Sequence, residues 1–110
     1  MKVKFSKLTV FKLERLNEYL INKWSVQTKN KFLKKLNSRI EIIAENPEIF
    51  PSSSIDPKLR KCIVTKQSTL LYEIHSDIIF VVNLSDDRQD KKTIHEEIKK
   101  HNGQHQPNEQ

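Results

Sequence analysis

The apolar residues of the C-terminal half fall into three short runs separated by short polar segments, each of which holds a two-residue joint. The runs are Cys62–Val64, Leu70–Ile74 and Ile78–Leu84. The polar joints are Gln67-Ser68 and Ser76-Asp77. Runs rich in β-branched and aromatic residues with such short connections predict three antiparallel strands in a meander.

Alternation along the middle run assigns its side chains to two faces. Leu70, Tyr72 and Ile74 share one face of the predicted strand, so core packing is the expected role of Tyr72. The third run is apolar on both faces. We therefore expect helices on one side of this strand and a partner or a terminal segment on the other.

The N-terminal half begins with a strand pattern that a helical pattern follows. In Lys2–Ser6, polar and apolar residues alternate with Val3 and Phe5 facing inward, so this segment should pair with the later strands. A first helix is expected from Thr9 as its N-cap. Its apolar stripe is Leu13, Leu16, Leu20 and Trp24.

A second helix is expected directly after the first. It should begin at Ser25 as N-cap and end at Asn46, because the following Pro47 disfavours helical backbone in the residue before it. Its apolar stripe is Leu33, Leu36, Ile40 and Ile43. Two helices this close in sequence form an antiparallel hairpin, which should pack its stripes on one face of the sheet.

Two further segments complete the predicted architecture. Residues 46–58, rich in proline and serine, form a crossing loop, and residues beyond the meander offer only Ile94 and Ile98 as a stripe, enough for a marginal helix at best. We predict an α+β domain over residues 1–92: an N-terminal strand and a two-helix hairpin on a small antiparallel sheet that the meander completes. Residues 93–110 are expected to form a weakly helical and then disordered polar tail.

Composition narrows the class of protein. The 110 residues fit one domain, and the single cysteine, Cys62, excludes an intramolecular disulfide. No apolar stretch reaches the roughly 18 residues of a membrane helix, so we expect a cytoplasmic protein without membrane contact. We expect no cofactor, because the only glycine lies in the tail, and no metal, because Cys62 and the tail histidines lack partners at ligand spacing.

Positive charge is concentrated in the N-terminal half. The net charge is +6, yet residues 1–46 alone hold 11 lysines and arginines against 4 acidic residues. Residues 47–84 hold 4 of each. This field favours an acidic protein, nucleic acid or the ribosome as a partner, and a lysine-rich solvated helix surface explains it equally well.

Four local motifs occur in an order that resembles a known superfamily. They are ENPEIFP at the end of the second helix, LRK at residues 59–61, LLYEI around Tyr72, and the closing DDRQD that contains Arg88. With the order of strand, helix hairpin, loop and three strands, they resemble the RelE/ParE superfamily of toxins from type II toxin–antitoxin systems. The DDRQD ending is similar to ParE-like members, although Lys91 stands where the family often has proline.

The resemblance implies a growth-inhibiting toxin, of the kind linked to plasmid stabilisation, that a cognate acidic antitoxin neutralises. The second face of the third strand should need cover, from the antitoxin or from self-association in its absence. ParE-type members poison DNA gyrase and other members cut mRNA on the ribosome, so the resemblance leaves open whether the chain is an enzyme. We favour gyrase because Thr69 stands where many of the nucleases carry an arginine. A small basic nucleic-acid-binding module is a third alternative.

Candidate site residues come from the same resemblance. The expected target-binding residues are Arg60, Lys61 and Arg88. A ribonuclease would add Lys66 as a phosphate contact and Glu73 with His75 as an acid–base pair on one face of the middle strand.

Structural roles compete with each of these functional roles. Glu73 and His75 fit two solvated surface residues, which is the commoner role of such a pair. Arg60 would equally serve as an ion-pair partner of Asp86 or Asp87 across the sheet, and Arg88 as a cap of the last strand through the same carboxylates. Trp24, at the turn of the helix hairpin, is either a core anchor or an exposed binding aromatic, the former being commoner.

Overall fold

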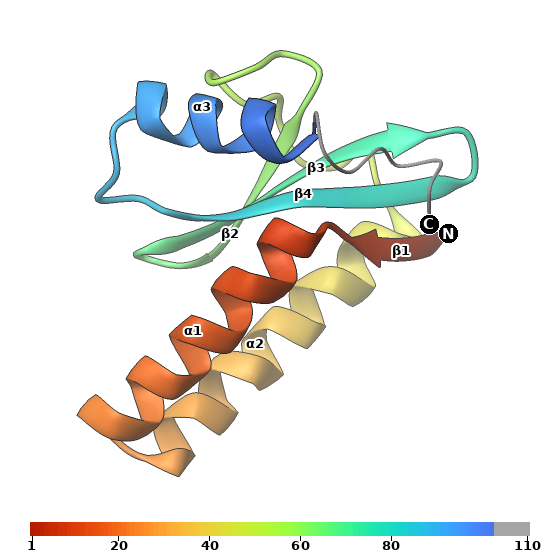
Figure 1. Ribbon diagram of the computed structural model, residues 1–110. Helices are drawn as coiled ribbons and strands as arrows, with labels where there is room; N and C mark the ends of the chain where they lie inside the picture. Colours follow the sequence, from red (N-terminus) through yellow and green to blue (C-terminus); the bar gives the residue numbers. More distant parts are fainter. Residues whose placement is uncertain (103–110) are drawn as a thin grey trace.

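A computed structural model describes residues 1–102, with side chains to residue 100, and these residues form four strands and three helices (Figure 1). The strands are β1 (Lys2–Phe5), β2 (Arg60–Thr65), β3 (Ser68–His75) and β4 (Ile78–Asp86). The helices are α1 (Lys7–Lys23), α2 (Val26–Glu45) and α3 (Lys91–Asn102). The α+β architecture predicted from the sequence is confirmed. None of these helices is long and apolar enough to cross a membrane.

The strands form one sheet in the order β1-β4-β3-β2. β2, β3 and β4 are antiparallel neighbours, as the meander pattern predicts. β1 instead runs parallel to β4, from Lys2 opposite Ile78 to Phe5 opposite Val81. The sheet is therefore mixed rather than antiparallel, because the direction of β1 is set by the helix hairpin that separates it from the meander.

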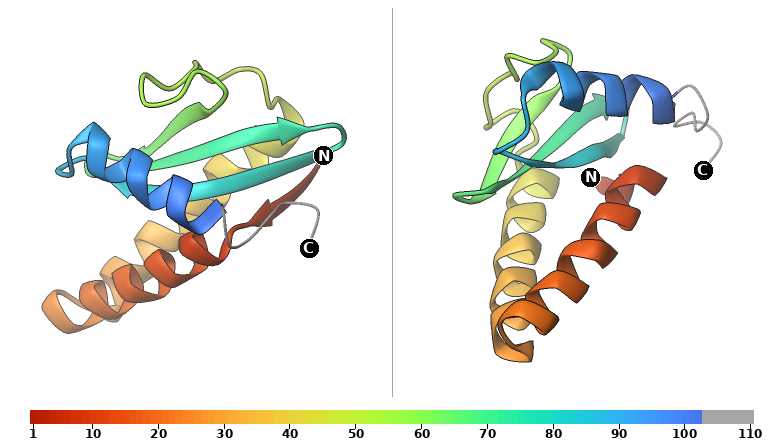
Figure 2. Two further views of the ribbon diagram at one scale, coloured as in Figure 1. Left: turned by 45° about the horizontal axis from the view of Figure 1, so that its top comes forward. Right: turned by 60° about the vertical axis from the view of Figure 1, so that its left-hand side comes forward.

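The two faces of the sheet are covered by different helices (Figure 2). α1 and α2 cover the face that carries Leu70 and Tyr72, and Val3 and Phe5 pack into this layer as expected. α3 lies against the opposite face. There its side chains join a second apolar cluster, which comprises Leu59, Leu71, Phe80, Val82, Ile94 and Ile98, with Ile55 packed against it.

α3 supplies the cover that the pattern of β4 requires. Ile94 and Ile98 are both buried, although the helix has only these two apolar positions facing the sheet. Tertiary contact thus stabilises a helix whose own sequence predicts marginal stability. The expectation of self-association through this face loses its basis. The boundary predicted at residue 92 falls within α3, and the disorder expected for residues 103–110 lies outside the described residues.

The start of α1 differs from the prediction. Ser6, not Thr9, is the N-cap: its Oγ accepts a hydrogen bond from the Thr9 backbone N–H at 3.0 Å. The hydroxyls of Ser6 and Thr9 also donate to the backbone carbonyls of Val82 and Val81 in β4, at 2.9 and 3.1 Å. Thr9 is buried by these contacts, so the edge of the sheet decides where the helix begins.

The other boundaries mostly agree with the sequence. Ser25 caps α2 by accepting from the Thr28 N–H at 3.1 Å, and α2 ends at Glu45 with Asn46 as C-cap. The first hairpin turn contains Lys66 and Gln67, one residue earlier than predicted, because Ser68 already pairs with Asp86.

Trp24 has the less common of its two expected roles. It is the C-cap of α1 at the far end of the hairpin, and 69% of its surface is exposed. The hairpin leans away from the sheet at this end (Figure 1), so Trp24 has no core to enter.

A basic groove between the helix hairpin and the sheet

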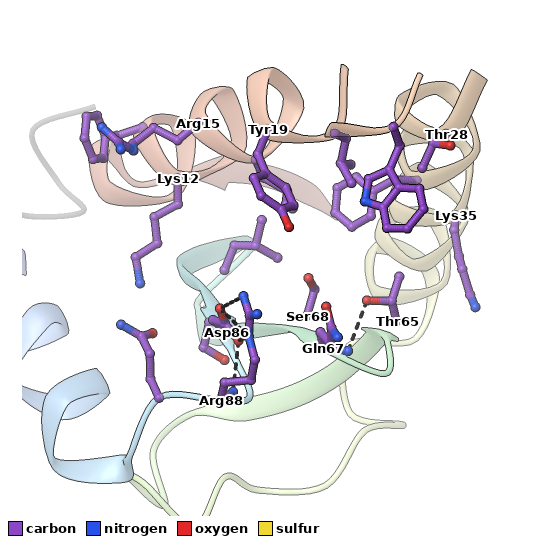
Figure 3. Close-up of a pocket in the computed structure, with 18 of the residues that line it drawn as sticks. Lys12, Arg15, Tyr19, Thr28, Lys35, Thr65, Gln67, Ser68, Asp86 and Arg88 are labelled. Carbon is purple, nitrogen blue, oxygen red and sulfur yellow. Dashed lines mark hydrogen bonds and ion pairs between the residues drawn. The ribbon is translucent and has the colours of Figure 1, made fainter. Parts of the chain in front are cut away.

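A groove of about 780 Å³ opens where the hairpin diverges from the sheet (Figure 3). One wall comes from α1, its C-cap and α2: Phe11, Lys12, Arg15, Leu16, Tyr19, Leu20, Trp24, Thr28, Lys31, Phe32 and Lys35. The other comes from the β2–β3 hairpin, the end of β4, the linker after it and α3: Thr65, Gln67, Ser68, Leu84, Ser85, Asp86, Arg88, Gln89 and Glu97.

The helical wall of the groove is aromatic and largely exposed. Phe11, Tyr19 and Trp24 are each more than half exposed, which is unusual for three large side chains on one surface. Phe11 and Tyr19 lie off the leucine stripe of α1 that packs on the core, whereas Trp24 continues that stripe beyond the end of the helix. The guanidinium of Arg15 lies over the ring of Phe11, 5.5 Å from its centroid, so this wall is both aromatic and positively charged.

Positive charge outweighs negative charge around the groove. Its lining contains five cationic side chains and two carboxylates. Lys12 pairs with Glu97 at 2.7 Å and Arg88 with Asp86 at 2.7 Å. The remaining cations, Arg15, Lys31 and Lys35, have no ion-pair partner within the described part of the chain. The groove therefore presents a net positive field above an apolar wall.

The Asp86–Arg88 pair is fixed by several hydrogen bonds. Arg88 donates from Nε to both carboxylate oxygens at 3.0 and 3.2 Å, and from Nη2 at 2.7 Å. Its backbone N–H donates to the same carboxylate at 2.9 Å. These bonds hold the pKa of Asp86 below its usual value of 3.8 and raise the pKa of Arg88. Figure 3 shows Tyr19 reaching across the groove toward this pair.

Asp86→Asn should lower the free energy of unfolding by about 0.5 kcal/mol at neutral pH, because a largely exposed ion pair contributes no more than that. The pKa of Asp86 is lower in the folded than in the unfolded chain, so its stabilisation is present above pH 3.8 and is lost as the pH falls through the folded value. Urea denaturation of both proteins from neutral to acid pH should show the difference shrinking toward zero. A difference that persists in acid would assign the effect to something other than ionisation.

Comparison with known proteins assigns the family. The model of the family described as "ParE toxin of type II toxin-antitoxin system, parDE" matches residues 3–91. The chain belongs to the ParE toxin family. A comparison with curated protein sequences finds no match.

A solved structure confirms the fold of this ParE-family chain. It is described as "Chromosomal ParDE TA system from P. aeruginosa", and the two chains superpose with a TM-score of 0.68 at 9% sequence identity. The similarity covers 78% of this chain and 95% of that one. At this low sequence identity the match shows a shared fold and nothing about activity.

In this ParE-family chain, Arg60 has a structural role, but with other partners than the carboxylates that the sequence suggested. Its Nη1 donates to the backbone carbonyls of Glu48 and Phe50 at 3.1 and 2.7 Å. The prediction of an ion pair between Arg60 and Asp86 or Asp87 is wrong, because the guanidinium is hydrogen-bonded to the backbone of the crossing loop instead. The alternative prediction for Arg88, a pair with Asp86, is confirmed.

The other candidates for a nuclease site do not converge. Glu73 and His75 do meet, with 2.6 Å between Oε1 and Nε2, on the surface of β3. They lie at the His75 end of β3, opposite Ile78, whereas Arg88 follows the end of β4 that pairs with Ser68.

Thr69, at the departure from the nuclease pattern, donates its hydroxyl to the carboxylate of Asp87 at 3.0 Å. Lys61 and Lys66 have no ion-pair partner in the described chain, and Lys66 flanks the groove without lining it.

Metal-binding groups and the single cysteine can be assessed in the same way. Among the described residues, no three histidine, cysteine or acidic side chains gather closely enough to hold a metal ion. Burial in the core raises the pKa of the Cys62 thiol to about 11, so this cysteine is no nucleophile at neutral pH.

Proposed function

We propose that this chain is a growth-inhibiting toxin that poisons DNA gyrase, and that a cytoplasmic acidic antitoxin neutralises it by occupying the groove. The observation that carries the proposal is the groove itself, with its exposed aromatic wall and excess of cations. Membership of the ParE family supports a toxin that has an antitoxin as its partner. The gyrase target and the place of binding are our inferences.

The chemistry of the groove fits an acidic amphipathic helix. Burying exposed aromatic rings such as Tyr19 and Trp24 supplies the favourable free energy of binding, because these residue types dominate protein interfaces. Lys31, Lys35 and Arg15 would meet carboxylates on the flank of that helix and steer its approach. A partner helix that lays its apolar side on α1 and its acidic side on α2 uses both properties.

The arrangement of the candidate catalytic residues favours gyrase poisoning over RNA cleavage. RNA cleavage needs charge-stabilising donors gathered around one phosphate, and losing one such donor typically costs about a hundredfold in rate. Here Arg60 is engaged by backbone carbonyls, and the Glu73–His75 pair lies far along β3 from Arg88. The short contact between Glu73 and His75 is the one observation that favours a ribosome-dependent nuclease.

Purified chain added to gyrase and relaxed plasmid should inhibit supercoiling or trap cleaved DNA. The same chain added to translating ribosomes and a defined mRNA should leave the message intact. A Glu73→Gln, His75→Gln double variant is the matched control, because it should inhibit gyrase as the parent chain does. Codon-positioned cleavage of the mRNA that this double variant abolishes would replace gyrase poisoning by the nuclease alternative.

The partner can be tested independently of the target. Cells that express this chain alone should stop growing, and co-expression of the adjacent reading frame should restore growth. The two products should then co-purify. Normal growth with the folded chain present at the same level would contradict the toxin proposal.

A further inference from the structure

α3 is attached to the rest of the fold by few side chains. Ile94 and Ile98 enter the apolar cluster on the second face of the sheet. One ion pair, between Lys12 of α1 and Glu97 of α3, joins the helix to the hairpin at 2.7 Å. The Asp90 carboxylate accepts a hydrogen bond from the Thr93 N–H at 2.7 Å and stabilises only the first turn of α3 itself.

A polar side chain lies unsatisfied on the same face of the sheet. Asn83 in β4 has 0% of its surface exposed, and neither Nδ2 nor Oδ1 has a hydrogen-bond partner among the described residues. Asn83 pairs with Leu71, whose side chain belongs to the cluster under α3, so the register places the amide on that face. The pairing of β3 with β4 shifts register here: Leu71 lies opposite Asn83, but Tyr72 lies opposite Val81. Ser6 and Thr9 bind the backbone of this same stretch of β4.

Burial of Asn83 opposes the docking of α3. A buried amide that makes no hydrogen bond has lost its contacts with water without replacement. If α3 moves away, the amide regains water, and the apolar cluster loses two isoleucines. Hydration of the amide thus favours release of α3, and burial of the two isoleucines favours docking. The free-energy difference between the covered and the uncovered sheet is therefore smaller than it would be with valine at position 83.

The attachment of α3 is also part of the groove. Lys12 and Glu97 both line it, and so does Arg88 in the linker between β4 and α3. A carboxylate that enters the groove near Lys12 competes with Glu97 for the same ammonium group. Occupation of the groove and docking of α3 therefore share one ion pair.

We propose that α3 is a reversible cover whose release accompanies binding of the acidic partner in the groove, an inference that rests on the groove being the partner's site. The uncovered state has Lys12 free and binds the partner. The covered state has Lys12 held by Glu97 and binds it less well. Linkage makes the effect reciprocal: whatever weakens the docking of α3 tightens partner binding.

Release of α3 can be measured without any partner. In an Ile98→Cys variant, the introduced thiol should react with a thiol reagent at least about tenfold faster than native Cys62. The reason is that α3 leaves the sheet more often than the whole domain unfolds. Cys62 is fully buried on the opposite face and serves as the internal reference for global unfolding. Equal labelling rates for the two thiols would show that α3 leaves only when the whole domain unfolds, and would overturn the proposal.

Asn83→Val tests the coupling from a position that carries no charge and does not line the groove. In the Ile98→Cys background it should slow labelling of the introduced thiol about tenfold, because the unsatisfied amide is gone. Without the cysteine substitution, it should weaken binding of the co-purified antitoxin by a similar factor, since the binding-competent fraction falls. Glu97→Gln should change both quantities in the opposite direction.

Ile63→Val, at an exposed position of β2, is the matched control and should change neither quantity. Unchanged antitoxin affinity in Asn83→Val, with slower labelling, would show that α3 opens independently of the groove and would overturn the coupling. Failure of the adjacent gene product to bind at all would instead refute the proposed function, while the labelling rates would still decide whether α3 is a reversible cover.

Discussion

Trp24→Ala is expected to weaken binding of the acidic antitoxin about 30-fold or more, because an interface tryptophan typically contributes 2 kcal/mol or more when it is truncated. The side chain is 69% exposed in the free chain and lines the groove, so it has most of its surface left to bury on a partner. Titration calorimetry of the purified pair measures the loss. The free energy of unfolding of the free chain should change by no more than about 0.5 kcal/mol, as for other exposed positions.

Ile49→Ala is the matched control for this experiment. Ile49 is exposed to a similar degree, but it lies in the crossing loop and does not line the groove. Its substitution should leave affinity unchanged. An equal loss in both variants, or none in Trp24→Ala, would place the antitoxin elsewhere on the surface.

Tyr72→Ala is expected to lower the free energy of unfolding by about 3–5 kcal/mol, the usual range for truncating a fully buried aromatic residue. Tyr72 is 0% exposed at the centre of the layer between the sheet and the hairpin. Its hydroxyl donates to the Pro47 carbonyl at 2.6 Å, which joins the sheet to the end of α2. Burial raises its pKa to about 12, so this bond persists across the neutral range.

Tyr72→Phe separates the ring from the hydroxyl. It should cost about 1 kcal/mol, since the half-buried Pro47 carbonyl then loses its donor while the ring still fills the core. Tyr19→Ala, on the exposed surface of α1, should cost less than about 0.5 kcal/mol. Urea denaturation gives all three values. A small effect of Tyr72→Ala would mean that the core collapses around the missing ring.

The fold could be predicted wherever local pattern and tertiary contact agree. The alternation of Leu70, Leu71 and Tyr72 gave the two faces of β3 correctly, because a buried sheet leaves no other register. The start of α1 could not be predicted from the sequence alone. Ser6 and Thr9 are both good caps, and the carbonyls of β4, more than 70 residues away, decide between them.

The groove was harder to predict because no single segment contains it. Arg88 was a candidate from its motif. Lys31 and Lys35 line the same groove only because the hairpin packs against the sheet, and no local motif marks them. One signal was present in the sequence: Phe11 and Tyr19 lie eight residues apart, off the leucine stripe. Two large aromatic residues on the polar side of an amphipathic helix indicate a surface that binds something.

The pairing of β1 with β4 joins two segments that leave the ribosome at well-separated times, because the helix hairpin, the crossing loop and two strands are synthesised between them. Val3 and Phe5 must wait until residues 78–81 have been synthesised before their strand has a neighbour. Such long-range closure slows folding, and it leaves a nascent chain with an unpaired segment and an open sheet edge. A message cut short anywhere before β4 therefore cannot yield an assembled sheet, however completely its helix hairpin has formed.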